Sequence, residues 1–421
     1  MDGYLLDWAS LLLRWAHVIV AIAWIGSSFY FVFLDSSLLA PTDPALKAKG
    51  VDGELWAVHG GGFYNPQKYG VAPPSLPAHL HWFFWESYST RLTGFALFTV
   101  LYLFNAGTFL IDKTVFDWPP GAAVAAALAF LAAFWIVYDL ICRWVGERQG
   151  QVGGDALVGA LVLVCVVAAS WAACQLFAGR AAFLMVGAMM ATAMSANVYF
   201  WIISGQKTVI AQMQAGQAAL AIHGQRAKQR SVHNTYFTLP VLVAMLSIHY
   251  GWLTQGRLTW SVLVALMLAG ALIRHSFVAR HKALVRGARV PWEYAAVGCA
   301  LLLALVVALA PSPQGAATTA APTMAAVQAV VEQRCVVCHN AQAQQKNVAL
   351  HTSALLKKHA QAVYQQAVVL KLMPMNNATQ ITDAERALIK RWFEPARRRS
   401  SQPTVYLVDG SAAATSATRR K

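Results

Sequence analysis

Long apolar stretches separated by short polar segments make up the chain as far as residue 310. Eight of them contain enough mostly apolar residues to cross a bilayer as a helix, which takes about 20 residues for roughly 30 Å of hydrocarbon. The pattern therefore predicts a helical membrane bundle. The predicted spans are 8–34, 86–110, 119–141, 155–178, 181–205, 234–252, 258–276 and 292–310.

The first apolar stretch differs from a secretory signal peptide. A signal peptide has a positively charged start and a short apolar core. Here Asp2 and Asp7 lie at the start, no basic residue precedes Arg14, and the apolar run is too long. We therefore expect a first membrane span that stays in the protein.

Basic residues divide unevenly between the two sets of loops. With the N-terminus outside, the inside loops carry fourteen Lys and Arg residues and the outside loops carry three. Because Lys and Arg accumulate in cytoplasmic loops, the N-terminus and everything after residue 310 are expected outside. The inside residues are Lys47, Lys49, Lys68, Arg143, Arg148, Lys207, Arg226, Lys228, Arg230, Arg274, Arg280, Lys282, Arg286 and Arg289; the outside residues are Lys113, Arg180 and Arg257.

Composition agrees with a membrane protein. Charged residues make up 12% of the chain and hydrophobic residues 57%, whereas a soluble domain has about 25% charged residues. This balance excludes a disordered chain, a fibrous repeat and an ordinary cytosolic domain. The net charge of +15 is consistent with the basic residues of the inside loops, so we expect a lipid bilayer as partner and no nucleic acid.

The chain changes character after the last span. Residues 311–323 read PSPQGAATTAAPT, a composition typical of a linker. Residues 324–395 form a separate predicted domain that contains Cys335, Cys338 and His339 in the sequence CVVCH. Residues 396–421 are basic and rich in Ala, Thr and Ser, so we expect a disordered tail. The predicted membrane domain is residues 1–310.

The CVVCH sequence matches the attachment motif for c-type haem, C-x-x-C-H. The thiols of Cys335 and Cys338 would bond the two vinyl groups of one porphyrin, and His339 would be an axial iron ligand. A zinc site would need a second ligand pair, and none with ordinary spacing follows. A redox dithiol usually opens a helix in a βαβ unit, and no strands are evident in this segment.

The order of features around this motif is similar to that of class I cytochromes c. A Met-Pro loop follows the haem motif, and the similarity implies that Met373 is the second axial ligand, with Met375 as the alternative. Thr382 and Glu385 then form a predicted capping box that begins a last helix.

Histidines within or beside the spans suggest a second haem site. Ionisable residues inside a bilayer are expensive and point to function, and histidine is a usual ligand of b-type haem. His17 with His249 is the preferred pair, toward the outer side. His81, His233 and His275 form an alternative group near the inner ends of their spans. A histidine that only hydrogen-bonds to a neighbouring helix is the competing interpretation.

Candidate substrate residues occur in three places. Glycines in HGGGFY allow close approach of a ligand to the backbone, and neighbouring aromatic rings can stack on a flat molecule. Acidic and basic residues mark the start of the second span, and polar residues mark the inner end of the fifth. The candidates are Phe63, Tyr64, Glu86, Arg91, Asn197 and Gln206.

The membrane region also contains, in order, LLLRWAHVIVAIAWIGSSFYFVFLDSSL, HGGGFY, LHWFFWESYSTRLTGF, MSANVYFWIISGQK and VHNTYFTLPVLVAMLSIHY. This series resembles the bacterial membrane-bound urate oxidases, also called urate hydroxylases, over essentially the whole chain. The resemblance implies an all-α fold of eight membrane helices fused to a C-terminal cytochrome c. It also implies oxidation of urate to 5-hydroxyisourate, with electrons passing through haem c, not directly to oxygen.

Under this interpretation the protein lies in the bacterial inner membrane with its cytochrome c domain in the periplasm. A respiratory cytochrome oxidase or a soluble cytochrome c would then receive the electrons. The alternative from another functional class is a haem-containing module that passes quinol electrons to cytochrome c without urate chemistry. A transporter with a tethered cytochrome would predict internal repeats, and none is visible.

Overall fold

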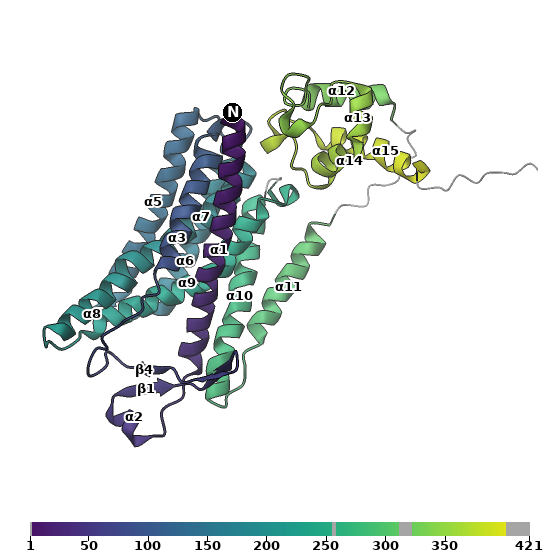
Figure 1. The fold of residues 1–421 in the computed structure, drawn as a ribbon. Helices are drawn as coiled ribbons and strands as arrows, with labels where there is room; N and C mark the ends of the chain where they lie inside the picture. Colours follow the sequence, from purple (N-terminus) through teal and green to yellow (C-terminus); the bar gives the residue numbers. More distant parts are fainter. Residues whose placement is uncertain (1, 255–257, 311–321, 401–421) are drawn as a thin grey trace, which may run out of the picture. The chain divides into compact units, whose positions relative to one another are not determined.

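The computed structural model describes residues 2–254, 258–310 and 322–400, and most of these residues are helical (Figure 1). The chain divides into two compact units. Unit 1 comprises Met1–Gln314 and Leu370–Ala378, and unit 2 comprises Gly315–Val369 and Thr379–Lys421. Of the predicted linker, residues 311–321 lie outside the described residues.

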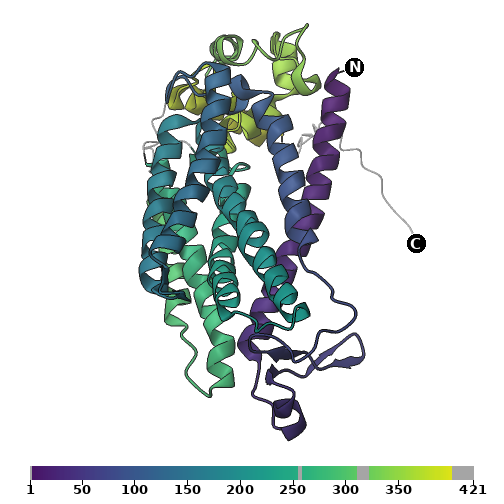
Figure 2. The same ribbon diagram turned by 90° about the vertical axis from the view of Figure 1, so that its left-hand side faces the viewer.

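Unit 1 is a bundle of long helices that run side by side (Figures 1 and 2). Its helices are α1 (Asp2–Ser37), α2 (Pro44–Ala48), α3 (Trp85–Phe98), η1 (Thr99–Leu103), α4 (Ala106–Phe109), α5 (Pro120–Trp144), α6 (Asp155–Leu176), α7 (Gly179–Ala196), η2 (Asn197–Ile203), α8 (Ser204–Gln214), α9 (Ala221–Ser247), η3 (Gly251–Thr254), α10 (Thr259–Val285), α11 (Glu293–Ala308) and η6 (Met375–Asn377).

In the described part of the chain, three small antiparallel strand pairs interrupt the all-α pattern that the sequence predicts. They are β1 (Val51–Glu54) with β4 (Gln67–Tyr69), β2 (Ala57–His59) with β3 (Gly62–Tyr64), and β5 (Glu147–Arg148) with β6 (Gln151–Val152). All three lie in polar connections between helices. The β2–β3 hairpin is formed by the HGGGFY segment, where Gly60 and Gly61 take positive φ angles that favour glycine.

Five helical segments of the described residues are long and apolar enough to cross a membrane. They are Trp8–Ser37, Pro120–Trp144, Asp155–Leu176, Gly179–Gln214 and Thr259–Val285.

The other three predicted spans fall on elements outside this set. α3 ends at Phe98 and gives way to the π-helical turn η1. The first part of α9 is polar, and α11 has 16 residues. Five of the eight predicted spans therefore coincide with helices that are long and apolar enough to cross a membrane. The other three spans stay predictions.

α7 is the central helix of unit 1, and most of its side chains are buried. It is rich in Gly, Ala and Met, and small residues let helices approach closely. At Gly187 an added Cβ would lie 3.1 Å from the Cβ of Ala244 on α9. The absence of a side chain at Gly187 therefore lets α7 and α9 pack closely.

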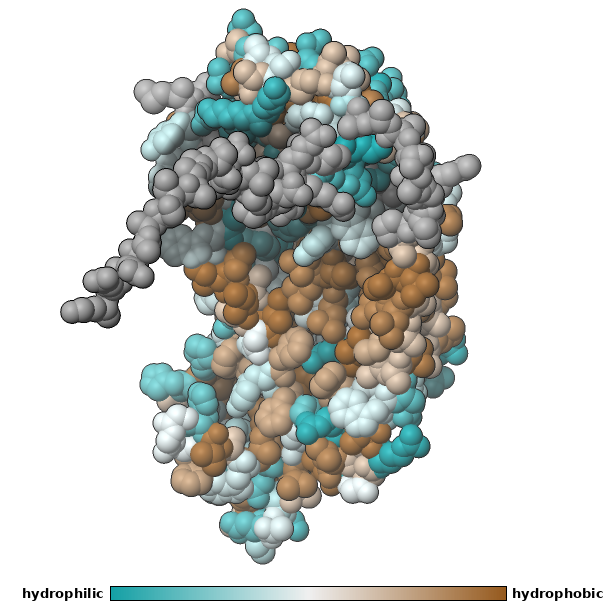
Figure 3. Space-filling model, turned by 90° about the vertical axis from the view of Figure 1, so that its right-hand side faces the viewer, coloured by the Kyte–Doolittle hydropathy of each residue, from teal (hydrophilic) through white to brown (hydrophobic). Residues whose placement is uncertain are grey.

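Polar connections gather at one end of the bundle. The strands β1 and β4, the tip of α8 and the α10–α11 connection lie at the end opposite the N-terminus of α1 (Figures 1 and 2). On the face in Figure 3, apolar residues cover the middle of the bundle, and polar residues become more frequent toward this end.

Two of the fourteen basic residues assigned to inside loops are instead buried in helices. Arg230 lies in α9 and is 1% exposed, and Arg274 lies in α10 and is 7% exposed. The loop assignment was wrong for both, because α9 begins before the predicted span and α10 continues beyond it.

Unit 2 packs short helices around a small apolar core. Its elements are α12 (Met324–Arg334), η4 (Gln345–Asn347), α13 (Ser353–Lys358), α14 (Ala360–Val363), η5 (Tyr364–Val369) and α15 (Asp383–Ser400). The core includes Val327, Leu350, Leu356 and Ile389. The helical secondary structure expected for residues 324–395 is present, whereas most of the predicted tail, residues 401–421, lies outside the described residues.

The predicted capping box at the start of α15 is confirmed. The backbone N–H of Glu385 donates to Thr382 Oγ1 over 3.2 Å, and the backbone N–H of Thr382 donates to Glu385 Oε2 over 2.6 Å. Arg334 on α12 also donates to Glu385 over 3.0 Å. The cap therefore begins α15 and connects it to α12.

Candidate functional site

A cluster of polar and aromatic side chains lies inside unit 1 between α5, η2 and α9. We call it the buried polar cluster. Its members are Tyr138 and Asp139 from α5, Asn197 and Trp201 from η2, and Arg230, His233 and Asn234 from α9.

An ion pair anchors the buried polar cluster. Arg230 Nη2 lies 2.9 Å from Asp139 Oδ1, and Trp201 Nε1 donates to the same oxygen over 2.7 Å. The guanidinium of Arg230 also lies over the rings of Trp201 and Tyr138, with 4.9 and 5.2 Å to their centroids. Because the carboxylate offsets the guanidinium, the pair is neutral as a whole.

Hydrogen bonds connect the rest of the cluster. The side-chain amide of Asn197 donates to the Tyr138 hydroxyl and to Asn234 Oδ1, each over 2.9 Å. The Tyr138 hydroxyl shares a 2.9 Å hydrogen bond with His233 Nδ1. The imidazole of His233 is therefore held in one orientation by a fully buried phenol.

Local helix geometry explains why these residues meet. His233 and Asn234 follow Arg230 by three and four residues on α9, a spacing that puts them on one face. Asn197 and Trp201 belong to a π-helical turn, a feature that frequently occurs at functional sites. That turn directs both side chains toward α5.

The cluster leaves only two buried polar atoms without a partner among its described members, Asn197 Oδ1 and Arg230 Nη1. Its positive charge already has a carboxylate partner, so it is poorly suited to binding an anion. It does contain a paired phenol and imidazole, which can exchange a proton.

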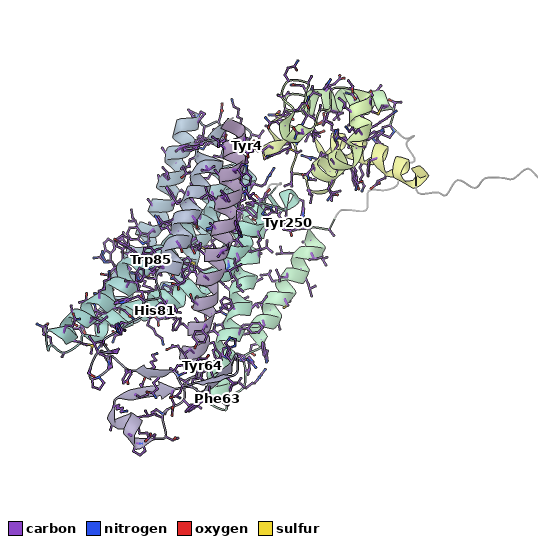
Figure 4. All side chains as sticks on the ribbon, in the orientation of Figure 1. Tyr4, Phe63, Tyr64, His81, Trp85 and Tyr250 are labelled. Carbon is purple, nitrogen blue, oxygen red and sulfur yellow. The ribbon has the colours of Figure 1, made fainter. Side chains whose placement is uncertain are left out.

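The predicted substrate residues are spread over unit 1. Phe63 and Tyr64 are 77% and 53% exposed on β3 at the polar end of the bundle (Figure 4). Arg91 on α3 and Gln206 on α8 are exposed, and Glu86 is half-buried. Asn197 alone among these candidates belongs to the buried polar cluster.

His17 faces α3. Its Nδ1 lies 3.1 Å from Thr93 Oγ1, and an added Cβ at Gly94 would come within 2.9 Å of the imidazole. His249 is exposed and adjoins Tyr250, which lies toward the same end of the bundle as Tyr4 (Figure 4). No hydrogen bond or ring contact of the described residues joins His17 to His249.

The three other histidines have separate partners. The ring of His81 contacts Phe83 edge-on, with 4.8 Å between centroids. His275 Nδ1 lies 2.7 Å from the Tyr236 hydroxyl, and His233 belongs to the buried polar cluster. None of the contacts in the described part of the chain pairs two of these histidines, so the haem b ligands stay a prediction.

The CVVCH motif in unit 2 forms one compact turn. The backbone N–H groups of Cys338 and His339 both donate to the Cys335 carbonyl, over 3.2 and 3.1 Å. Cys335 is buried and Cys338 is exposed. Burial raises the pKa of the Cys335 thiol to about 11, so that thiol is protonated at neutral pH.

The imidazole of His339 is oriented by the backbone. Its Nδ1 lies 2.9 Å from the Val348 carbonyl oxygen, so Nδ1 carries the proton and donates it. This leaves the lone pair of Nε2 available to a metal, an arrangement common for metal-binding histidines. The residues present therefore fit a covalently attached haem.

Met373 and Met375 lie in Leu370–Ala378, which groups with unit 1. The axial role of Met373 therefore stays a prediction. Among the described residues, no three His, Cys, Asp or Glu side chains are arranged to hold a bare metal ion.

Sequence reasoning missed Tyr138, Asp139, Trp201 and Asn234. The available signal was Asp139, an acidic residue within the otherwise apolar third span. Arg230 was assigned to a loop, so its pairing with a residue 91 positions earlier was not foreseen.

Residues 3–310 match the family model described as urate oxidase, N-terminal. This match covers nearly all of the helical bundle of unit 1. Comparison with curated proteins gave no match, and neither did comparison with solved structures.

Proposed function

The chain belongs to the urate oxidase N-terminal family, and on this premise we propose that it oxidises urate to 5-hydroxyisourate. In the balanced step, one water adds its oxygen to C5 of urate, and two protons and two electrons leave. The family match over the helical bundle carries the proposal. The enzyme must therefore bind urate, accept protons and pass on electrons.

The electron acceptor that we propose is a haem c held by Cys335, Cys338 and His339. When bound, this group accepts single electrons and passes them on. The protein supplies the two thiols in one turn and an imidazole oriented by Val348. Electrons would continue to a respiratory cytochrome oxidase or a soluble cytochrome c.

We propose that unit 1 lies in the bacterial inner membrane and that unit 2 is periplasmic. Five apolar helices of sufficient length support the membrane placement. The excess of basic residues in connections at one end supports an orientation with that end in the cytoplasm. The three additional spans belong to this proposal.

Residues of the buried polar cluster have a suitable chemistry for proton transfer. Removal of an N–H proton from the purine requires a base, and His233 shares its hydrogen bond with Tyr138. Tyr236 lies about one turn further along α9 and is paired with His275. Both phenol–imidazole pairs are therefore candidate proton acceptors.

A b-type haem in the bundle remains part of the hypothesis, with His17 as the first candidate ligand. Thr93 orients its ring, and the absence of a side chain at Gly94 gives that ring room. Since the described contacts pair it with no second histidine, we assign no step to this group.

The proposed function is tested with the purified full-length protein under argon. Adding urate should reduce the c-type haem, seen in its visible absorption bands, and should form 5-hydroxyisourate. The Cys335→Ser, Cys338→Ser variant should lose covalent haem and the response. Reduction by a quinol but not by urate would contradict the proposal and favour the electron-transfer module.

A further inference from the structure

Arg274 on α10 is a buried cation for which the described residues supply no carboxylate partner. It is 7% exposed, and its Nε and Nη2 atoms have no hydrogen-bond acceptor. No ion pair among the described residues joins Arg274 to an Asp or Glu side chain, whereas the buried Arg230 pairs with Asp139. An uncompensated buried charge is strongly destabilising, so an anion is the missing partner.

Aromatic and titratable groups surround this guanidinium. It lies over the ring of Phe29 on α1, with 3.6 Å to the centroid. The next residue on α10, His275, has its Nδ1 2.7 Å from the hydroxyl of Tyr236 on α9. His275 in turn contacts the ring of Tyr294 on α11, at 4.4 Å between centroids.

An open cavity of about 410 Å³ lies further along α1 and α10. Phe33, one turn beyond Phe29, and His281, about two turns beyond Arg274, both line this cavity. Their rings contact each other edge-on at 5.1 Å. Its lining residues belong to the ends of α1 and α10 and the segment just after α1, and these ends lie at the polar end of the bundle (Figure 1).

The unpartnered atoms define the shape of the ligand. Nε–H and the adjacent Nη2–H of a guanidinium are parallel donors on one edge, suited to two neighbouring acceptors of an anion. Urate is a monoanion at neutral pH, and a deprotonated ring amide presents a nitrogen and an oxygen side by side. A planar purine anion therefore matches this edge.

We propose that Arg274 binds the urate monoanion through this pair of donors, beside Phe29 and the Tyr236–His275 pair. The inference rests on the proposed function and adds the location of the substrate. Both donor atoms are shielded, and Phe29 is 37% exposed. Phe29 therefore separates the guanidinium from the outside, and binding of urate at this edge requires its ring to move.

The other basic candidates fit less well. Arg230 is already neutralised by Asp139. Arg91 is exposed, and water would weaken its attraction for an anion.

The test is urate binding to the full-length protein in detergent, by calorimetry and by the shift in thermal midpoint. R274M should weaken binding at least about 30-fold, because it removes one partner of a buried charge pair. R274K keeps the charge without the paired donors, so its affinity should be intermediate. R286Q, which removes an exposed arginine from the end of the same helix, should bind like wild type.

The thermal midpoint measured without urate distinguishes a ligand-binding role of Arg274 from a structural one. R274M should melt no lower than wild type, because a buried charge without a partner has been removed. A lower midpoint with unchanged urate affinity would overturn the inference. If R274M does not fold, unchanged affinity in R274K would overturn it equally.

Three further outcomes are distinguishable. If wild type oxidises urate while R274M retains full affinity, the site is wrong and the proposed function stands. If wild type neither binds nor oxidises urate, the proposed function fails. If anionic phospholipid, and not urate, raises the midpoint in an Arg274-dependent way, the ligand is a lipid headgroup and the inference fails.

Discussion

At the scale of single residues, the Arg230–Asp139 pair leads to a prediction about stability. Asp139→Asn leaves a buried guanidinium without a counter-charge and should lower the free energy of unfolding by about 3–5 kcal/mol. Arg143→Gln, which removes a half-exposed arginine 3.9 Å from the same carboxylate, should change it by less than about 1 kcal/mol. Denaturant titration in detergent measures both.

The double replacement by Leu at 139 and 230 completes this comparison. Apolar residues of similar volume often replace a buried ion pair at little cost, so the double variant should be more stable than Asp139→Asn. Equal losses of unfolding free energy in Asp139→Asn and Arg143→Gln would show that the buried ion pair does not stabilise the bundle.

Single residues also show where sequence reasoning stops. The sequence indicated Asn197 and His233 separately, as a substrate residue and a haem ligand, but their connection through Tyr138 depends on helix packing. Spacing along one helix is visible in a sequence, whereas contacts between helices are not. Asp139 was readable as a charged residue in a span, but its partner was not.

At the scale of elements, the cap of α15 makes a pH-dependent contribution. Burial raises the pKa of the Glu385 carboxyl, but hydrogen bonds from the Thr382 backbone and Arg334 outweigh it and lower the pKa below its ordinary 4.5. This stabilisation is complete above the ordinary pKa and is lost as pH falls through the lowered value. Amides at the start of α15 should therefore lose protection in acid.

Hydrogen exchange of the full chain, followed by mass spectrometry, measures this effect. Thr382→Ala should cost about 1 kcal/mol and speed exchange at the start of α15 about five-fold. Glu385→Gln should remove the additional loss of protection in acid. Thr352→Ala, which removes the cap of α13, should leave α15 unchanged; a five-fold effect there would contradict a local role for Thr382.

Helices were easier to predict than their ends. The capping box of α15 follows from side-chain types at fixed spacing, and the structure has it. The beginning of α9 was missed because its first half is polar and is stabilised by packing within the bundle, which hydropathy does not report. The strand pairs were missed because each strand is very short.

At the scale of the whole molecule, the orientation of the bundle is testable. A periplasm-active reporter fused after residue 310 should be active, and a cytoplasm-active reporter inserted in 206–220 should be active, because basic connections favour the cytoplasmic side. The assay is reporter activity in intact cells at equal expression. The opposite pattern would overturn the proposed placement and leave no route to haem attachment at Cys335 and Cys338.

The separation of 91 positions between Asp139 and Arg230 has a consequence for biosynthesis. In a chain that enters the bilayer helix by helix, α5 arrives before α9 has been made, by about 5–20 s at ordinary synthesis rates. Asp139 must then be accommodated without Arg230. Arg143, one turn away on the same helix and 3.9 Å from its carboxylate, is a provisional counter-ion near the end of α5. In that order of synthesis, Arg143 would offset the charge of Asp139 until Arg230 reaches the carboxylate.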